Sequence, residues 1–354
     1  MAARARSAAR RGFAIALLPL SMVPFAMVVP GVINPTPHGR GVRLHGGSGP
    51  TPAPNVSLTA AELSQFTPPP AYGGAIPVLV FHGIGNWQDR YTVSQDNFAR
   101  ELALLQHLRY HTISTDQYAA WRRGEKVKLP SRPILITFDD GRFDSWRGAD
   151  RVLARYRMRA TMFVITGPVV RHNLFYLKWN EIQQMQRSGR WDIQFHANNG
   201  HVDVVDDAKG NIGAYYAVLE YSNGHMESLA HYRARVENDI VTGLATMNRH
   251  GYYNLPTMAM PYGEYGQVDA HSNPRVKPVL SKILTKYFVA DFVQSGHART
   301  PYSTRGTGRA IRYQLHTTTT LSELYGFLLG EDPAARSKLS PSALQALTNA
   351  AARG

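Results

Sequence analysis

From Ile76 onward, short apolar segments of β type alternate with segments of helical periodicity. Parallel strands need long crossover connections, which are usually helices, so this alternation predicts an α/β fold with a parallel sheet. The segments predicted to contain strands are 76–85, 132–141, 159–166, 191–201, 256–266, 286–293 and 310–317, and the predicted helices are 94–108, 146–158, 177–189, 228–251 and 319–330. In the first of these helices Ser94 is a plausible N-cap, and Phe98 and Leu102 begin its apolar face.

The composition excludes several classes of protein. A chain of 354 residues that is 44% hydrophobic can bury a sizeable core, which excludes a disordered or collagen-like chain. Cysteine is absent, so disulfides, thiolate zinc sites and cysteine nucleophiles are excluded. The net charge of +14 is not gathered into a long basic run. This pattern disfavours nucleic-acid binding and favours attraction to an anionic envelope surface.

The first 33 residues have the pattern of a signal peptide or an N-terminal membrane anchor. Four arginines lie within residues 1–11, and residues 12–33 are mostly apolar with no charged side chain. This run is about long enough to span a bilayer. No clear cleavage site follows it, so both interpretations stay open. Either one predicts an exported protein that is extracellular or attached to the cell surface.

The remaining boundaries follow from composition. Residues 34–74 are rich in Pro, Gly, Ser and Thr, which is typical of an extended linker. The folded domain is predicted to occupy residues 75–331. Residues 332–354 are rich in Ala and Ser and are predicted to form a C-terminal tail.

Polar residues follow several of the predicted strands. Active groups of parallel sheets collect at the carboxyl ends of strands, so these residues are candidates for one common site. They are His82, Asp139, Asp140, His196, His201 and Pro261–Gly263.

The segment ITFDDG places two carboxylates side by side where a strand ends. Neighbouring side chains of an extended chain point in opposite directions, so one of Asp139 and Asp140 can bind a metal while the other faces a water molecule. Gly141 allows the backbone to turn sharply. The alternative is an ordinary Asp-Asp-Gly β-turn without a catalytic role.

His196 and His201 are five residues apart in FHANNGH. On a helix this spacing would separate them by about 140°, so they would not share a face. In a loop they can converge, because Asn198, Asn199 and Gly200 tolerate left-handed backbone angles. Two imidazoles and one carboxylate form a plausible three-ligand metal site with an open position for water. The alternative is a pair of solvent-exposed loop histidines.

Together these segments resemble polysaccharide deacetylases of the NodB-homology type, carbohydrate esterase family 4. The resemblance covers about residues 76–330 and is greatest to the branch that deacetylates poly-N-acetylglucosamine in bacterial envelopes. TFDDG and HANNGH resemble the first two family motifs, MPYGEY resembles the third, and IPVLVFHGIG resembles the entry strand of that branch. The resemblance implies an irregular (β/α) barrel with a single catalytic domain.

The resemblance also implies roles for the polar residues. Asp140, His196 and His201 hold a divalent metal, zinc in the first place, with cobalt or nickel as alternatives. The metal polarises the acetamide carbonyl and acidifies a water molecule, and Asp139 accepts the proton as general base.

The remaining site residues have substrate-facing roles in the same family. Pro261, Tyr262 and Gly263 bind the substrate, and the backbone N–H of Tyr262 stabilises the oxyanion. His82 protonates the leaving amine in the branch resembled here. His316 is the alternative general acid, since it lies near the C-terminus where the ordinary motif order would put it.

Two family features are missing. The third motif usually begins with an Arg that orients the catalytic Asp, but here Met258, Ala259 and Met260 precede Pro261. The fourth motif, Asp-x-x-Asp-Trp, is also absent, and Asp291 is only a loose match for it.

The implied function is hydrolysis of N-acetyl groups on an extracellular N-acetylglucosamine-containing polysaccharide, with release of acetate. The expected partners are the glycan substrate and an envelope or membrane surface, which the protein contacts through its N-terminal segment. The protein is expected to be a monomer. One alternative is a catalytically inactive glycan-binding module of the same fold, for which the missing Arg argues. The other is a metal-dependent amidohydrolase that acts on peptidoglycan or small amides.

Overall fold

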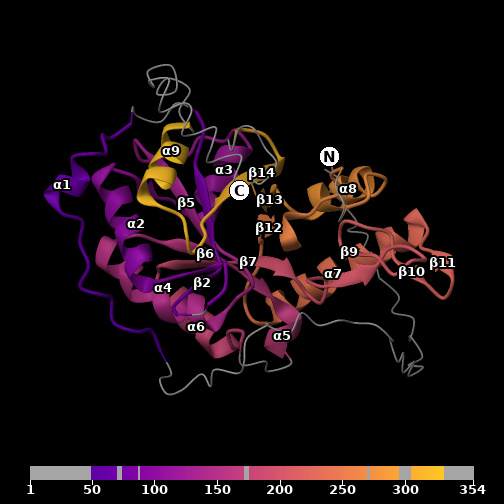
Figure 1. Cartoon of the computed structure of the whole chain (residues 1–354). Helices are drawn as coiled ribbons and strands as arrows, with labels where there is room; N and C mark the ends of the chain where they lie inside the picture. Colours follow the sequence, from indigo (N-terminus) through magenta and orange to yellow (C-terminus); the bar gives the residue numbers. More distant parts are fainter. Residues whose placement is uncertain are drawn as a thin grey trace, which may run out of the picture. The chain divides into compact units, whose positions relative to one another are not determined.

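Seven parallel strands close into a barrel in the order β1, β14, β13, β12, β7, β6 and β5, and β5 pairs back with β1 (Figure 1). The computed structural model describes residues 49–69, 74–86, 88–170, 175–268, 272–294 and 304–330. The barrel strands are β1 (Val78–Phe81), β5 (Pro133–Phe138), β6 (Ala160–Ile165), β7 (Trp191–Ala197), β12 (Thr257–Ala259), β13 (Ala290–Gln294) and β14 (Gly308–Gln314). The predicted irregular (β/α) barrel is confirmed.

The strands β1, β5 and β6 are apolar on both faces because every residue in them is buried. On β1, Val78 belongs to a cluster inside the barrel, whereas Leu79 and Phe81 pack with the surrounding helices. Phe163 of β6 and Phe292 of β13 fill the interior, where their ring centroids lie 5.7 Å apart. The barrel is therefore a packed core rather than a channel.

Helices cover the outside of the barrel. They are α2 (Gln95–His107), α4 (Phe143–Tyr156), α5 (Thr166–Val170), α6 (Trp179–Arg187), α7 (Leu229–Arg249), α8 (Lys277–Tyr287) and α9 (Leu321–Gly330). As predicted, α2 begins after Ser94, whose hydroxyl accepts the N–H of Asn97. The sequence patterns predicted five of these helices, and the short α5 and the helix α8 were not anticipated.

One further helix, α3 (Thr115–Arg122), closes the amino end of the barrel. Its Tyr118 and Trp121 side chains belong to the interior cluster. The Arg122 guanidinium donates to the carbonyls of Gly308 and Arg309 at the start of β14, at 3.2 and 3.1 Å. The helix α3 therefore plugs the amino end of the barrel, and the candidate site residues lie at the carboxyl end.

Short strands decorate the connections and were not predicted, because two or three residues show no periodicity. They are β2 (Gly83–Ile84), β3 (Thr92–Val93), β4 (His111–Thr112), β8 (Asp203–Val205), β9 (Ile212–Ala214), β10 (Tyr221–Ser222) and β11 (His225–Met226). β2 pairs with β3 directly after β1, and the β8–β9 and β10–β11 hairpins precede α7.

Residues 49–69 lie along the barrel domain, although they belong to the predicted linker 34–74. They include the short helix α1 (Ala60–Leu63). Thr51 N–H donates to the carbonyl of Arg147 at 2.9 Å, and Leu58 and Phe66 are buried in the hydrophobic core. This part of the linker is therefore not a free spacer, and we call it the N-terminal strap.

The predicted leader 1–33 and the predicted tail 332–354 lie outside the described residues. All described residues belong to the compact unit Ile33–Gly354. Among the helices they form, none is both long enough and apolar enough to pass through a bilayer.

Candidate active site

The carboxyl ends of β1 and β5 bring two of the predicted site residues together. Phe81 pairs with Phe138 in the parallel register, so His82 and Asp139 each follow a paired residue. The Asp139 N–H donates to the Phe81 carbonyl at 3.1 Å, which extends the ladder to the strand ends. The site is therefore assembled on the rim of the sheet, as the sequence pattern predicted.

Asp140, His196 and His201 form a compact group of possible metal ligands. One donor atom from each residue lies within 4.8 Å of the others. Asp140 Oδ1 lies 3.4 Å from His196 Nε2 and 3.3 Å from His201 Nε2. Asp140 and Gly141 have φ of 71° and 69°, and this left-handed turn aims the Asp140 carboxylate at the imidazoles.

The chemistry of these donors fits a divalent cation. His196 Nδ1 lies 2.7 Å from the Ala259 carbonyl, so it carries the proton and leaves the Nε2 lone pair facing Asp140. Asp140 Oδ1 is buried and makes no hydrogen bond within the described residues. Burial raises the pKa of Asp140, but the His196 and His201 imidazoles outweigh it and hold that pKa well below its usual range. An ionised carboxylate and two imidazoles are a typical zinc-type ligand set.

The loop between the two histidines folds differently from the sequence prediction. Asn198, Asn199 and Gly200 do not adopt positive φ. Instead, the Asp239 carboxylate on α7 accepts the N–H groups of Asn198 and Asn199 at 2.9 and 2.8 Å. Gly200 is required for space, because a Cβ there would lie 2.7 Å from the ring of Tyr216. The loop conformation is therefore fixed by hydrogen bonds to α7 and not by the local backbone preferences of Asn and Gly.

The guanidinium that the third motif lacks comes from β14. Arg312 is fully buried and bonds both oxygens of Asp139, at 2.7 and 2.6 Å, and its Nη1 also donates to Thr137 at 3.1 Å. The same guanidinium lies over the interior rings of Phe163 and Phe292. Burial raises the pKa of Asp139, but Arg312 outweighs it, so that pKa lies below its usual value. The family motif would place this Arg just before Pro261, so the resemblance did not point to Arg312.

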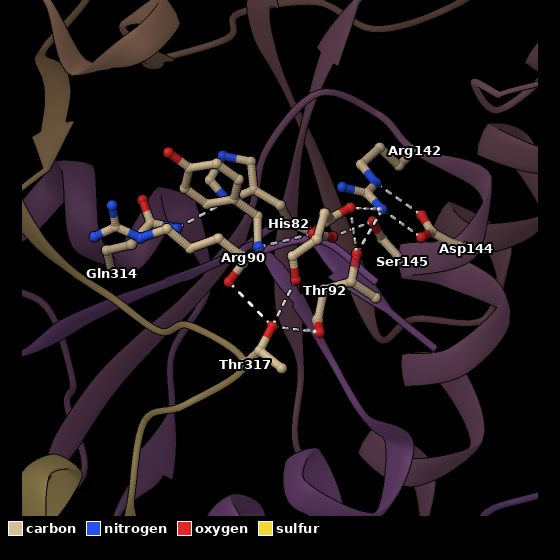
Figure 2. A network of polar contacts seen from close by, with 10 residues as sticks. His82, Arg90, Thr92, Arg142, Asp144, Ser145, Gln314 and Thr317 are labelled. Carbon is tan, nitrogen blue, oxygen red and sulfur yellow. Dashed lines mark hydrogen bonds and ion pairs between the residues drawn. The ribbon is translucent and has the colours of Figure 1, made fainter. Parts of the chain in front are cut away.

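His82 is held at both its ring and its backbone (Figure 2). The Gln314 amide donates to His82 Nδ1 at 3.0 Å, and the Ser145 hydroxyl donates to the His82 carbonyl. Burial lowers the pKa of His82, although the carboxylates of Asp140 and Asp139 act in the opposite direction. With Nδ1 accepting from Gln314, the neutral imidazole carries its proton on Nε2.

His316 does not belong to the group of possible metal ligands formed by Asp140, His196 and His201. Its ring lies 5.6 Å from the ring of Tyr91, and its Nε2 lies 3.4 Å from Arg90 Nη2. Burial and the nearby Arg90 lower the pKa of His316 to about 4. The loose fourth-motif match, Asp291, pairs with Arg309 at 2.9 Å instead of with either histidine.

The Pro261–Gly263 segment forms the short helical turn η1 directly after β12. Tyr262 has φ of 58°, and its ring centroid lies 4.4 Å from that of His201. Gly263 also has positive φ, and a Cβ there would lie 2.2 Å from Gln294 Oε1. The turn therefore presents the half-exposed Tyr262 ring beside the metal-ligand group, as expected for a substrate contact.

Comparisons with known sequences agree with this arrangement. Residues 126–272 match the family described as polysaccharide deacetylase. Poly-β-1,6-N-acetyl-D-glucosamine N-deacetylases of Staphylococcus aureus strain MRSA252 and of Staphylococcus epidermidis are each 29% identical over 114 residues. The match covers 31% of this chain and spans only 39% of the length of each relative.

Solved structures share the fold. A de-N-acetylase from Aggregatibacter actinomycetemcomitans has a TM-score of 0.62 at 18% identity, with 72% of this chain and 99% of that chain covered. The BpsB deacetylase domain of Bordetella bronchiseptica has a TM-score of 0.55 at 20% identity, over 69% and 100%. IcaB from Ammonifex degensii has a TM-score of 0.53 at 21% identity, over 72% and 97%.

Proposed function

We propose that this chain, which carries a polysaccharide deacetylase domain, is a metal-dependent hydrolase that removes N-acetyl groups from an N-acetylglucosamine polysaccharide. The observation that carries the proposal is the gathering of three kinds of group at one end of the barrel. These are the Asp140–His196–His201 donor set, the Asp139–Arg312 pair and the His82 imidazole. Amide hydrolysis needs a Lewis acid, a base and a proton donor within reach of one carbonyl.

Asp140, His196 and His201 would hold the metal, and two imidazoles with one carboxylate suit zinc, with cobalt or nickel as alternatives. When bound there, the metal would polarise the acetamide carbonyl and lower the pKa of a water molecule. The hydrogen bond from His196 Nδ1 to the Ala259 carbonyl orients one of these ligands in advance.

Proton transfers fall to the neighbouring residues. Asp139 accepts a proton from the attacking water, and Arg312 keeps Asp139 ionised and fixes the direction of its oxygens. His82 must act here as an imidazolium: it donates a proton to the amine nitrogen as the carbon–nitrogen bond breaks, and the proton that Asp139 took from the water restores it. The products are acetate and a protonated glucosamine unit. By the family resemblance, the backbone N–H of Tyr262 would stabilise the oxyanion.

Acetate release from N-acetylglucosamine oligomers tests this function. The full chain is compared in metal-stripped form, with zinc, cobalt or nickel added back, and as the Asp139→Asn variant. We expect metal-dependent release, which Asp139→Asn lowers by at least about 100-fold while the metal still binds. Asp116→Asn, an exposed carboxylate on α3 at the plugged end, is the matched control. Loss of the metal in Asp139→Asn would reverse the roles of Asp139 and Asp140.

The inactive glycan-binding alternative depended on the missing Arg. Arg312 supplies a guanidinium to Asp139 from another strand, so this argument no longer favours that alternative. A folded, metal-loaded chain that releases no acetate from any glycan would restore it. Release from small amides or peptidoglycan alone would favour a general amidohydrolase.

We also propose that the chain is exported and works as a monomer at an envelope surface. The support is the basic and then apolar pattern of residues 1–33, which lie outside the described residues. Cell fractionation with N-terminal sequencing of the purified chain tests export and distinguishes a cleaved leader from a retained anchor. A chain found intact in the cytosol would refute it.

A further inference from the structure

Two half-exposed tyrosines stand at the open end of the barrel on different strands of the ring. Tyr262 lies beside His201, which follows β7, and Tyr91 lies beside His82, which follows β1. In the barrel order, β5 and β6 separate β1 from β7 on one side, and β14, β13 and β12 separate them on the other. The two rings are therefore on opposite sides of the candidate active site.

The Tyr91 ring is half-exposed, but its backbone is held by hydrogen bonds. Tyr91 N–H donates to Asp89 Oδ1 at 2.7 Å, and the Tyr91 carbonyl accepts from the N–H of Gly83 at 3.3 Å. The Thr317 hydroxyl lies 2.8, 3.1 and 3.0 Å from the carbonyl oxygens of Asp89, Arg90 and Thr92. The backbone that carries the ring is thus already ordered, so a ligand does not have to order this loop when it binds.

The surroundings of Tyr91 suit a sugar rather than a core contact. The ring centroid lies 5.2 Å from that of His82 and 5.6 Å from that of His316. Arg90 lies next to it, with its guanidinium carbon 5.9 Å from the ring centroid. A pyranose has one face of C–H groups, which packs on an aromatic ring, and hydroxyls at its edge, which accept hydrogen bonds from a guanidinium.

We propose that Tyr91, with Arg90 at its edge, binds a sugar unit of the polymer adjacent to the one that is deacetylated. This assignment rests on the proposed function and extends it: the protein selects chains of several sugars over free N-acetylglucosamine. Tyr91 is a specificity residue, because its contact is with a sugar away from the reacting amide.

The experiment measures kcat/KM for acetate release from free N-acetylglucosamine and from its oligomers of two to five units with the metal-supplemented full chain. We expect Tyr91→Ala to lower the ratio of kcat/KM for the pentamer to that for free N-acetylglucosamine by about tenfold, mainly through KM. Tyr91→Phe and Tyr91→Trp should restore the ratio, since they keep a ring. Tyr253→Ala is the matched control, because Tyr253 is 65% exposed and precedes β12 at the plugged end.

Two results would overturn the assignment. One is a Tyr91→Ala variant with the wild-type ratio at every chain length, and the other is a Tyr91→Phe variant as impaired as Tyr91→Ala. If the wild type releases no acetate, the proposed function fails and calorimetric titration of the full chain with the pentamer decides separately. Weaker binding of the pentamer by Tyr91→Ala than by Tyr253→Ala would then support a sugar-binding role for Tyr91, and equal binding would refute it.

Discussion

Replacement of Arg312 by Met tests how the buried ion pair at the site works. Met preserves much of the apolar stem but strands the Asp139 carboxylate in a position that is only 1% exposed. Hydrogen bonds to charged groups contribute about 1.5–3 kcal/mol each, and removal of one partner of a buried pair costs about 3–5 kcal/mol. The two bonds at 2.7 and 2.6 Å therefore predict a loss of about 4 kcal/mol in the free energy of unfolding.

The sign of the pH effect follows from the same contacts. Without Arg312, only His196 and His82 still act against the effect of burial on Asp139, so the pKa of Asp139 rises. We expect the acid limb of the pH–rate profile to move to higher pH in Arg312→Met. In the native protein the low pKa of Asp139 contributes stability that is present above its unfolded pKa and is lost as the pH falls through its folded pKa.

The assay is urea unfolding of the metal-free protein, followed by circular dichroism, in a double-mutant cycle with Asp139→Asn. We expect Arg312→Met to cost at least about 2 kcal/mol less in the Asp139→Asn background than in the wild type. Arg123→Met is the control, because Arg123 and Glu125 form an exposed pair, which contributes little to stability. Additive costs within about 0.5 kcal/mol would refute the view that Arg312 and Asp139 act as one unit.

Three further predictions follow from other buried contacts. Burial raises the pKa of Glu101, which has no partner among the described residues, so stability falls as the pH rises above about 4.3. At pH 8 the free energy of unfolding of Glu101→Gln, measured by urea titration, should exceed that of the wild type by at least about 1 kcal/mol. The difference should shrink as the pH is lowered towards 4. Asp239→Asn should weaken zinc binding by about 10- to 100-fold in competition with a chelating dye, because the loop before His201 loses an acceptor. A chain that begins at residue 72 should melt at a lower temperature than the full chain, because burial of Leu58 and Phe66 contributes about 1.5–3 kcal/mol each.

Features that depend on a short stretch of sequence could be predicted from the sequence alone. Apolar runs on both faces predicted the barrel strands, and Asp139, Asp140, His196 and His201 could be selected because each lies at or just beyond the end of such a run. The parallel topology then placed these ends on one rim. Short elements such as α3 escaped because eight residues carry little periodicity.

Contacts between distant segments could not be predicted in the same way. Asp239 supports the histidine loop from α7, and nothing in FHANNGH points to it. Arg312 did leave a signal, since in a strand it shares a face with Ala310, and these two are the buried residues of β14. A charge at such a position requires a partner. Which carboxylate it meets depends on the order in which the barrel closes, and that order is not visible in the sequence.

The position of β14 as the last strand of the barrel has a consequence for when activity can appear. Chains fold broadly from the N-terminus as they are synthesised, so the proposed ligands at the carboxyl ends of β5 and β7 are made long before Arg312 and Gln314. Until β14 inserts between β13 and β1, Asp139 has no guanidinium and His82 has no amide to orient it. A nascent or truncated chain could thus contain all three proposed metal ligands and still be inert, so the proposed activity would begin only with the completed barrel.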